Sequence, residues 1–465
     1  MNAPVIWILL PLILSTLLWL PRRGYVTAIL GGLTALTLSA LAWLIPIDTA
    51  LRVGAFSIKI STSLPILGRR ISLNPADQSV LTLIYGLTAL WFFGASAAGI
   101  ARRLIPLGLA ITALLVGSLA VEPFLYAALL IETAILIAIP LLSPPHQKPG
   151  RGIIRFLIYQ TLAMPFILFA GWLLVGVEAS PGDLELVIQS AILLGLGFAF
   201  LLAIFPLYTW IPLLLEETSP YAVGFILWLL PTITLLFGAS FLDRYAWLRE
   251  SPQLPSALRF AGLVMITTGG VWAAFQRHLG RMMGYAAITG IGFSLLALSL
   301  TPNYGLSAFF LLIIPQTLGL AIWSLSLSVL RIRGEPITFK VLQGQIQTYP
   351  IISTGIILAN LSAAALPLLA NFPPILAIWD GVARQSIASA LWLGLGLAGV
   401  FTGAIRTLAV LVMAPKDTPW EWHGTWSQNI LIGLGIIFLF VLGVFPQWLQ
   451  PLLVNLPTTF ERLGR

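Results

Sequence analysis

The chain has 465 residues, of which 58% are hydrophobic and 9% are charged, and its formal net charge is +8. A soluble domain carries about 25% charged residues, so this composition indicates an integral membrane protein without a sizeable soluble domain. The sequence has no cysteine, which excludes disulfides, thiol catalysis and cysteine-ligated metal sites, and its three histidines lack metal-ligand spacing, so we expect no metal and no cofactor.

Apolar runs of about 20 residues recur along the whole chain and predict an all-α membrane protein with about fourteen transmembrane helices. Proline and glycine interrupt two of these runs, within 197–220 and 361–374, and such breaks are tolerated where the backbone lines a cavity. Closely spaced glycines, Gly394, Gly396 and Gly399, permit close helix packing. The predicted spans are 3–21, 25–45, 79–100, 104–121, 123–142, 153–177, 186–205, 221–241, 257–275, 282–300, 305–330, 349–370, 386–412 and 427–445.

The first run is followed by Arg22 and Arg23, whereas a signal peptide has its basic residues before the apolar run. We therefore predict a first spanning helix with its N-terminus outside. This orientation places 13 lysines and arginines in inner loops and 10 in outer segments, four of them in one long loop at 46–78. Without that loop the bias is 13 against 6, as the positive-inside rule requires. The charge is spread over short loops, so it does not indicate nucleic-acid binding.

Segment 46–78 alternates polar and apolar residues and is not a span. Alternation with a period of two indicates β-structure, so we expect a β-hairpin or an interfacial strand on the outer face. The predicted organisation is then an N-terminal part at 1–100 with three helices and this hairpin, a core at 104–412 with ten helices, and a C-terminal loop and last helix at 413–465.

Glu132 is the only charged residue of the run 123–142, PFLYAALLIETAILIAIPLL, and about ten residues flank it on each side. A helix of this length places Glu132 near the bilayer midplane, where an ionised side chain costs at least ~2.5 kcal/mol. A charged residue at this depth either takes part in ion or proton transport or stabilises the packing between helices. The alternative without transport is a protonated Glu132 that is hydrogen bonded to a neighbouring helix.

Six segments resemble, in order, the signatures of one membrane protein family. The family comprises the large antiporter-like membrane subunits of the proton-translocating NADH:quinone oxidoreductase (complex I), of its hydrogenase relatives and of the Mrp antiporters. The most specific segment is FPLYTWIP…EETSP, which resembles the family signature PFHxWLPDAHxEAPTP. The others are FLYAALLIE, which ends at Glu132, RFLIYQTLAMPFILFAG, GRMMGYAAITGIGF, VLQGQIQTYP and ANLSAAALPLLANF.

The resemblance implies a bundle with two inverted repeats in the core, and a row of buried ionisable groups at the midplane along which protons pass. In the family, a fifth-helix Glu pairs with a seventh-helix Lys. A Lys or His in the eighth and eleventh helices continues the row, and a Lys or Glu in the broken twelfth helix completes it. Each charge biases the protonation of the next.

Only the glutamate of this row is retained here. The positions that match the membrane lysines and histidines are occupied by Leu201 in the seventh helix, Pro231 or Thr232 in the eighth, Pro315 and Gly319 in the eleventh, and Ile375 in the twelfth. Tyr208 stands where the PFHxW motif has histidine, and no lysine lies in any predicted span. A midplane carboxylate without a cationic partner is disfavoured by desolvation. We therefore expect Glu132 to be a protonated, hydrogen-bonded carboxylic acid.

Three further residues are candidates for a proton path. Glu217 follows the broken seventh helix beside Glu216, and the alternative is a solvated loop acid. Asp380 lies five residues beyond the missing lysine position at Ile375, and the alternative is an i,i+4 ion pair with Arg384 on a helix surface. Tyr208 either donates a hydrogen bond within the path or lies at the interface as an aromatic anchor.

These observations support three hypotheses about function. The first is an antiporter-like membrane subunit of a complex I, hydrogenase or Mrp-type assembly in a prokaryotic plasma membrane, with its proton path reduced or lost and other membrane subunits as partners. The chain carries no nicotinamide, flavin or quinone motif, so any redox chemistry belongs to those partners. The second is a stand-alone transporter of a small or lipidic substrate, with a cavity open to lipid at the broken helices. The third is a purely structural spacer subunit.

Overall fold

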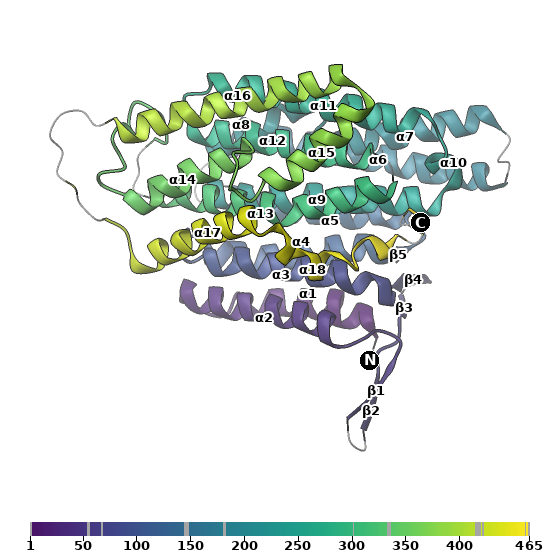
Figure 1. Cartoon of the computed structure of the whole chain (residues 1–465). Coiled ribbons are helices and arrows are strands. Elements are labelled where there is room, and N and C mark those ends of the chain that lie inside the picture. Colours follow the sequence, from purple (N-terminus) through teal and green to yellow (C-terminus); the bar gives the residue numbers. More distant parts are fainter. Residues whose placement is uncertain are drawn as a thin grey trace.

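The computed structural model describes residues 2–53, 56–66, 68–143, 148–179, 183–300, 302–332, 336–413, 420, 423–460 and 462–463. Most of these residues are helical, and the helices lie side by side in one bundle (Figure 1). The main helices are α1 (Leu10–Leu17), α2 (Gly24–Leu44), α3 (Gln78–Gly94), α4 (Ala101–Ala120), α5 (Leu125–Leu142), α6 (Arg151–Ala179), α7 (Leu184–Leu201), α8 (Trp210–Glu217), α9 (Pro220–Arg244), α11 (Gln253–Phe275), α12 (Leu279–Leu298), α13 (Pro302–Ile332), α14 (Pro350–Ala363), α15 (Phe372–Gln385), α16 (Ile387–Val412) and α17 (Trp426–Val444), with the single turn α10 (Ala246–Arg249) after α9.

Eleven helices in the described part of the chain are long and apolar enough to cross a membrane. They confirm the predicted all-α membrane protein, and every predicted span overlaps a helix. Three predicted spans correspond to the shorter helices α1, α3 and α14, so length alone does not give fourteen spanning helices. α14 is short because it ends at an interruption, and α1 is short because the π-helical turn η1 (Val5–Leu9) precedes it.

Both predicted helix interruptions are present. The chain leaves α7 at Leu201 and passes through η3 (Leu207–Thr209) into α8, and it leaves α14 at Ala363 before α15 begins. Each break contains a non-glycine residue with left-handed backbone, Ala203 with φ 51° in the first and Ala365 with φ 57° in the second. Such a conformation costs about 1–3 kcal/mol and persists only where the surrounding structure imposes it.

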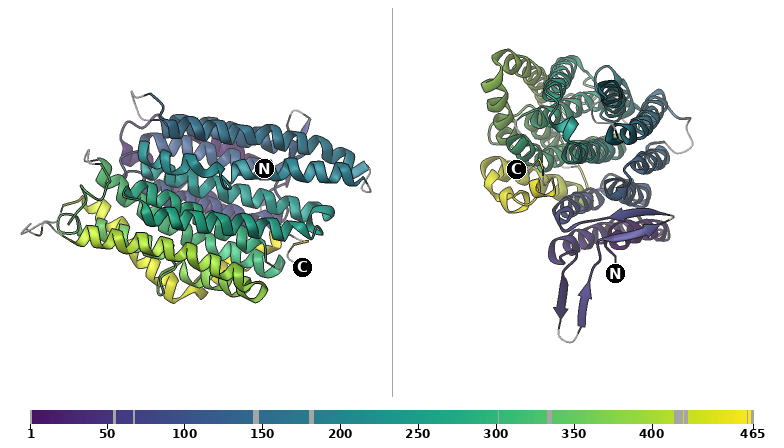
Figure 2. Two further views of the ribbon diagram at one scale, coloured as in Figure 1. Left: turned by 90° about the horizontal axis from the view of Figure 1, so that it is seen from above. Right: turned by 90° about the vertical axis from the view of Figure 1, so that its right-hand side faces the viewer.

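Segment 46–78 forms two antiparallel hairpins. β1 (Ala50–Val53) pairs with β2 (Phe56–Lys59), and β3 (Ser63–Ile66) pairs with β4 (Arg69–Ser72). β4 also pairs with β5 (Val121–Glu122), which directly follows α4. The β1–β2 hairpin projects away from the bundle (Figure 2). The second hairpin is therefore tied to the core of the chain, whereas the first is not part of the same sheet.

Glycine allows α11 and α16 to approach each other closely. A side chain on Gly270 of α11 would collide with the backbone of Gly396, and one on Gly399 would collide with the backbone of Gly270. Two of the three glycines that the sequence marks for close packing therefore lie at this contact, while Gly394 faces Trp379. Small residues permit such approach where helices pack without a hydrophobic driving force.

The chain beyond α17 forms a strap along the bundle. This C-terminal strap, residues 446–460 and 462–463, contains η4 (Pro446–Leu449), α18 (Gln450–Leu453) and η5 (Pro457–Thr459). The Thr459 hydroxyl donates to the carbonyl of Ala76 at 2.9 Å, and Asp243 Oδ1 accepts the Leu463 N–H at 2.9 Å. The strap therefore joins the end of the chain to the segment before α3 and to the end of α9.

Candidate functional site

Glu132 lies near the middle of α5, and its carboxyl group faces α6. The Thr161 hydroxyl of α6 donates to Glu132 Oε1 at 2.9 Å. The second carboxyl oxygen, Oε2, is buried and has no hydrogen-bond partner among the described residues. Both a carboxylate and a carboxylic acid accept such a hydrogen bond. The charge state of Glu132 stays a prediction.

Gln160, the neighbour of Thr161, faces the opposite way and contacts the first helix break. Its Nε2 donates to the carbonyls of Phe200 at 3.2 Å and Leu201 at 3.3 Å. These carbonyls belong to the last turn of α7, where the helical N–H donors run out, and that of Phe200 also accepts the Ala203 N–H at 3.2 Å. Gln160 is fully buried. A neutral amide of α6 thus caps the break at Leu201, the position that matches the family's seventh-helix lysine.

The other positions without lysine converge on one cavity. This cavity has a volume of about 80 Å³ and is lined by Pro231 and Thr232 of α9, Gly319 of α13 and Ile375 of α15. Residues of α12 and α14 complete its wall. Thr232, Thr317 and Gln316 lie near the middle of α9 and α13, so the cavity is at mid-height in the bundle. Its volume suffices for several water molecules, since one water needs about 10–15 Å³ of such space.

The lining of this mid-height cavity is neutral throughout the described residues. The Thr232 and Thr317 hydroxyls donate to carbonyls one turn earlier in their own helices, and Gln316 Nε2 donates to the carbonyl of Gly290 at 3.2 Å. Asn371, at the end of the second break, is 4% exposed and its Oδ1 has no partner among the described residues. A Cβ on Gly319 would lie 3.7 Å from Asn371 Nδ2, so an amide faces the position of the missing lysine.

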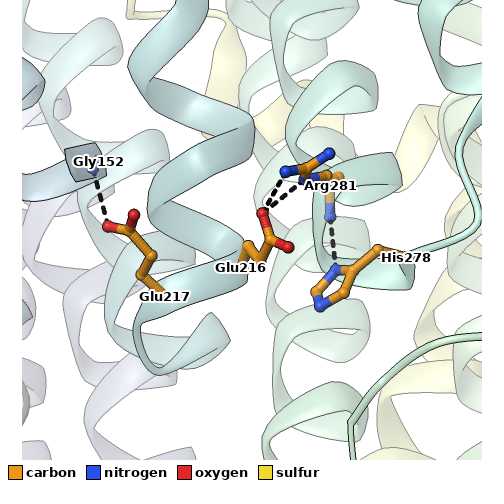
Figure 3. A network of polar contacts seen from close by, with 5 residues as sticks. All are labelled: Gly152, Glu216, Glu217, His278 and Arg281. Atoms are coloured by element: carbon orange, nitrogen blue, oxygen red, sulfur yellow. Dashed lines mark hydrogen bonds and ion pairs between the residues drawn. The ribbon is translucent and has the colours of Figure 1, made fainter. Parts of the chain in front are cut away.

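Two adjacent carboxylates at the end of α8 face different helices (Figure 3). Glu216 Oε2 accepts from Arg281 Nε at 2.7 Å and also forms an ion pair with its guanidinium. Glu217 Oε2 accepts the Gly152 N–H in the first turn of α6 at 2.8 Å. Arg331 of α13 donates to the Glu217 carbonyl at 2.9 Å, which satisfies a free carbonyl at the end of α8. The two acids therefore connect α8 to α6 and α12.

His278 precedes α12 and caps its first turn. Its Nδ1 accepts the Arg281 N–H at 3.3 Å, so a neutral imidazole carries its proton on Nε2 (Figure 3). Burial lowers the pKa of His278, while the nearby Glu216 carboxylate opposes this shift and Arg281 and Arg331 reinforce it. Burial therefore favours the neutral form of His278.

Comparison with known proteins identifies the architecture that holds these groups. The model of the transmembrane family described as NADH:quinone oxidoreductase/Mrp antiporter matches residues 152–403, more than half of the chain. The chain belongs to this family. The matched segment includes both helix breaks, the mid-height cavity and the two acids at the end of α8.

Among relatives of this antiporter family, NADH-quinone oxidoreductase subunit 14 of Thermus thermophilus is 26% identical over 328 residues, which are 68% of this chain and 73% of that subunit. NAD(P)H-quinone oxidoreductase chain 4-3 of a Nostoc species is 26% identical over 290 residues, or 57% of this chain. That match spans half the length of the Nostoc protein.

Several solved structures share the fold over nearly the whole chain. A chain of respiratory complex I from Thermus thermophilus superposes with a TM-score of 0.77 at 19% identity and covers 99% of this chain and 100% of its own. Chains of the archaeal membrane-bound sulfane sulfur reductase and of the Mrp complex from Dietzia give 0.81 and 0.79 at 16% identity, and each match covers 100% of this chain and 99% of that chain.

The remaining sequence candidates lie apart from Glu132. Tyr208 is buried in the first break, where its ring packs edge-on against Tyr285 at 6.3 Å between centroids. Asp380 forms the predicted i,i+4 ion pair with Arg384 at 2.8 Å on an exposed face of α15. The sequence did not indicate that Gln160 caps a break, although it is among the few polar residues of its span.

Proposed function

We propose that this chain is an antiporter-like membrane subunit of a multi-subunit respiratory or antiporter complex, and that its proton path is reduced to Glu132. The observation that carries the proposal is the neutral lining of the mid-height cavity. The resemblance assigns ionisable groups to positions in this lining that are occupied by Pro231 or Thr232, Gly319 and Ile375. A neutral cavity holds water but offers no group that takes up a proton. Stepwise proton transfer along a row of lysines therefore has no equivalent in the part of the core that surrounds this cavity.

The assembly state of the relatives supports a role within a complex. The proteins that share this fold are chains of complex I, of the sulfane sulfur reductase and of the Mrp complex. We infer that this chain likewise binds other membrane subunits in the plasma membrane of a prokaryote. We also infer that its N-terminus is outside, because this orientation places Arg281, Arg331 and Lys340 on the inner side, as the positive-inside rule requires.

The small size of the mid-height cavity argues against a stand-alone transporter of a lipidic substrate. A cavity of about 80 Å³ is far below the roughly 300–1,000 Å³ of sites that enclose such molecules. The purely structural spacer stays the alternative, and it differs from the proposal only in whether Glu132 relays protons.

Proton flux in vesicles that contain the native complex tests the proposal. Glu132→Gln removes the titratable group and keeps the size and the acceptor for Thr161. We expect the flux attributable to this subunit to fall to background, while Glu185→Gln, on the exposed start of α7, leaves it unchanged. Unchanged flux in Glu132→Gln, in a complex that still assembles, would refute the proton path and leave the spacer.

A further inference from the structure

A second, larger cavity opens at the end of the bundle where α11 ends and α12 begins. Its volume is about 610 Å³, in the range of sites for organic ligands. Arg277, Arg281 and Lys340 line it, together with His278 and Glu216, and we refer to it as the basic pocket. None of these residues takes part in the proposed proton path.

The basic pocket carries an excess of positive charge. Glu216 is its one carboxylate among the described lining residues, and this carboxylate is already paired with Arg281. Arg277 and Lys340 are exposed, and the described residues offer neither of them an ion-pair partner. Two cationic groups are therefore available to an anion at this site.

Backbone hydrogen bonds fix the walls of the basic pocket. The Phe339 N–H donates to the Arg277 carbonyl and the Leu279 N–H donates to the Ile337 carbonyl, both at 2.9 Å. The Gly344 N–H donates to the carbonyl of Val410 in α16 at 3.0 Å. The segment after α13 is thus attached to both neighbouring helices, which fixes the backbone that carries Arg277 and Lys340.

One wall of the pocket is apolar, and apolar side chains on the neighbouring helix are exposed. Val410 and Met413 at the end of α16 form this wall, and the Met413 side chain is 65% exposed. On the adjoining helix, Phe275 and Trp272 are also exposed, at 71% and 51%. A ligand that suits the site therefore combines an anionic head with an apolar body.

We propose that the basic pocket binds the phosphate headgroup of an anionic phospholipid, whose acyl chains lie against the outer faces of α11 and α16. Basic pockets between membrane helices on the cytoplasmic side are suited to such headgroups. Arg277 and Lys340 contact the phosphate, and Nε2–H of neutral His278 provides a further donor. The Glu216–Arg281 ion pair stays intact beneath it.

Native mass spectrometry of the purified protein, in an equimolar mixture of phosphatidylglycerol and phosphatidylcholine, tests this proposal. We expect the wild type to retain phosphatidylglycerol in preference to phosphatidylcholine. Each cation near the surface contributes about 1 kcal/mol, so Arg277→Gln with Lys340→Gln lowers this preference by roughly 30-fold and each single variant by about 5-fold. Both residues are exposed and bear no structural ion pair, so the variants keep the fold, which an unchanged melting temperature verifies.

The matched control is Arg22→Gln with Arg102→Gln, which removes two exposed charges from the same end of the bundle but outside the pocket. It leaves the preference unchanged. An equal loss in this control, or full retention in the pocket variant, overturns the proposal. Displacement of the lipid by inorganic phosphate as effectively as by excess phosphatidylglycerol would show a site for a soluble anion and also overturns it. None of these results depends on whether Glu132 relays protons.

Discussion

Gln160 caps the first helix break, and we expect removal of this cap to destabilise the break more than any other part of the bundle. Gln160→Met keeps the length and volume of the side chain but removes both N–H donors. The carbonyls of Phe200 and Leu201 then lose their bonds at 3.2 and 3.3 Å, and the Phe200 carbonyl keeps only the Ala203 N–H as a donor. Hydrogen bonds between membrane helices contribute about 0.6 kcal/mol each and at most about 1.7. Two of them give an expected loss of about 1–2 kcal/mol, confined to the break.

Hydrogen exchange measured by mass spectrometry is the suitable assay because it reports the break itself. The amides of Ala203 and Ile204 donate to carbonyls of Phe200 and Ala199 at the end of α7. If local opening becomes easier by 1–2 kcal/mol, their exchange accelerates by about 5- to 30-fold, while peptides from α16 are unaffected. Gln189→Met, on the exposed face of the same helix α7, is the control. Equal exchange at the break in the two variants would show that Gln160 does not hold it.

Two further changes probe helix contact and protonation. Gly270→Ala places a methyl group against the Gly396 backbone, so α11 and α16 must separate, and we expect the free energy of unfolding to fall by about 1–3 kcal/mol in thermal unfolding. The control Gly195→Ala has open space around it and is neutral or stabilising. Equal stability of the two variants would contradict the close contact. The pKa of His278 is lower in the folded chain than its ordinary value of 6.5, so the unfolded chain binds the additional proton as the pH falls through 6.5, and stability decreases there. His278→Asn keeps a side chain that accepts the capping hydrogen bond but does not titrate. Between about pH 7.5 and about pH 5.5, the melting temperature of this variant should fall less than that of the wild type. An identical fall would exclude His278 as a source of the pH dependence.

The helices and their two interruptions were predictable because they depend on local sequence. Apolar runs set the spans, and proline and glycine mark the breaks. The contact between Glu132 and a neighbouring helix was foreseen as a possibility, but its partner was not. Gln160 and Thr161 are adjacent, and successive residues point about 100° apart around a helix. Gln160 therefore reaches α7 and Thr161 reaches α5, and only the packed bundle shows which of the two contacts which helix.

The mid-height cavity lay beyond sequence reasoning for a different reason. Alignment by resemblance placed Pro231 or Thr232, Gly319 and Ile375 at separate points of the chain, each as the loss of one ionisable group. Their convergence depends on how α9, α13 and α15 pack across more than 140 residues of sequence. The adjacent acids Glu216 and Glu217 illustrate the same limit, because the sequence indicated a solvated loop where the structure has the end of α8 with contacts to two other helices.

The C-terminal strap has a consequence for the order of events during synthesis. Its contact from Thr459 to Ala76 spans 383 residues, so it forms only after all intervening helices have left the ribosome and entered the membrane. Asp243 receives the strap on the end of α9, which must by then have inserted in its final direction. A helix that inserts with the wrong polarity displaces one of these attachment points to the opposite side of the bilayer. Closure of the strap thus marks a chain whose topology is complete.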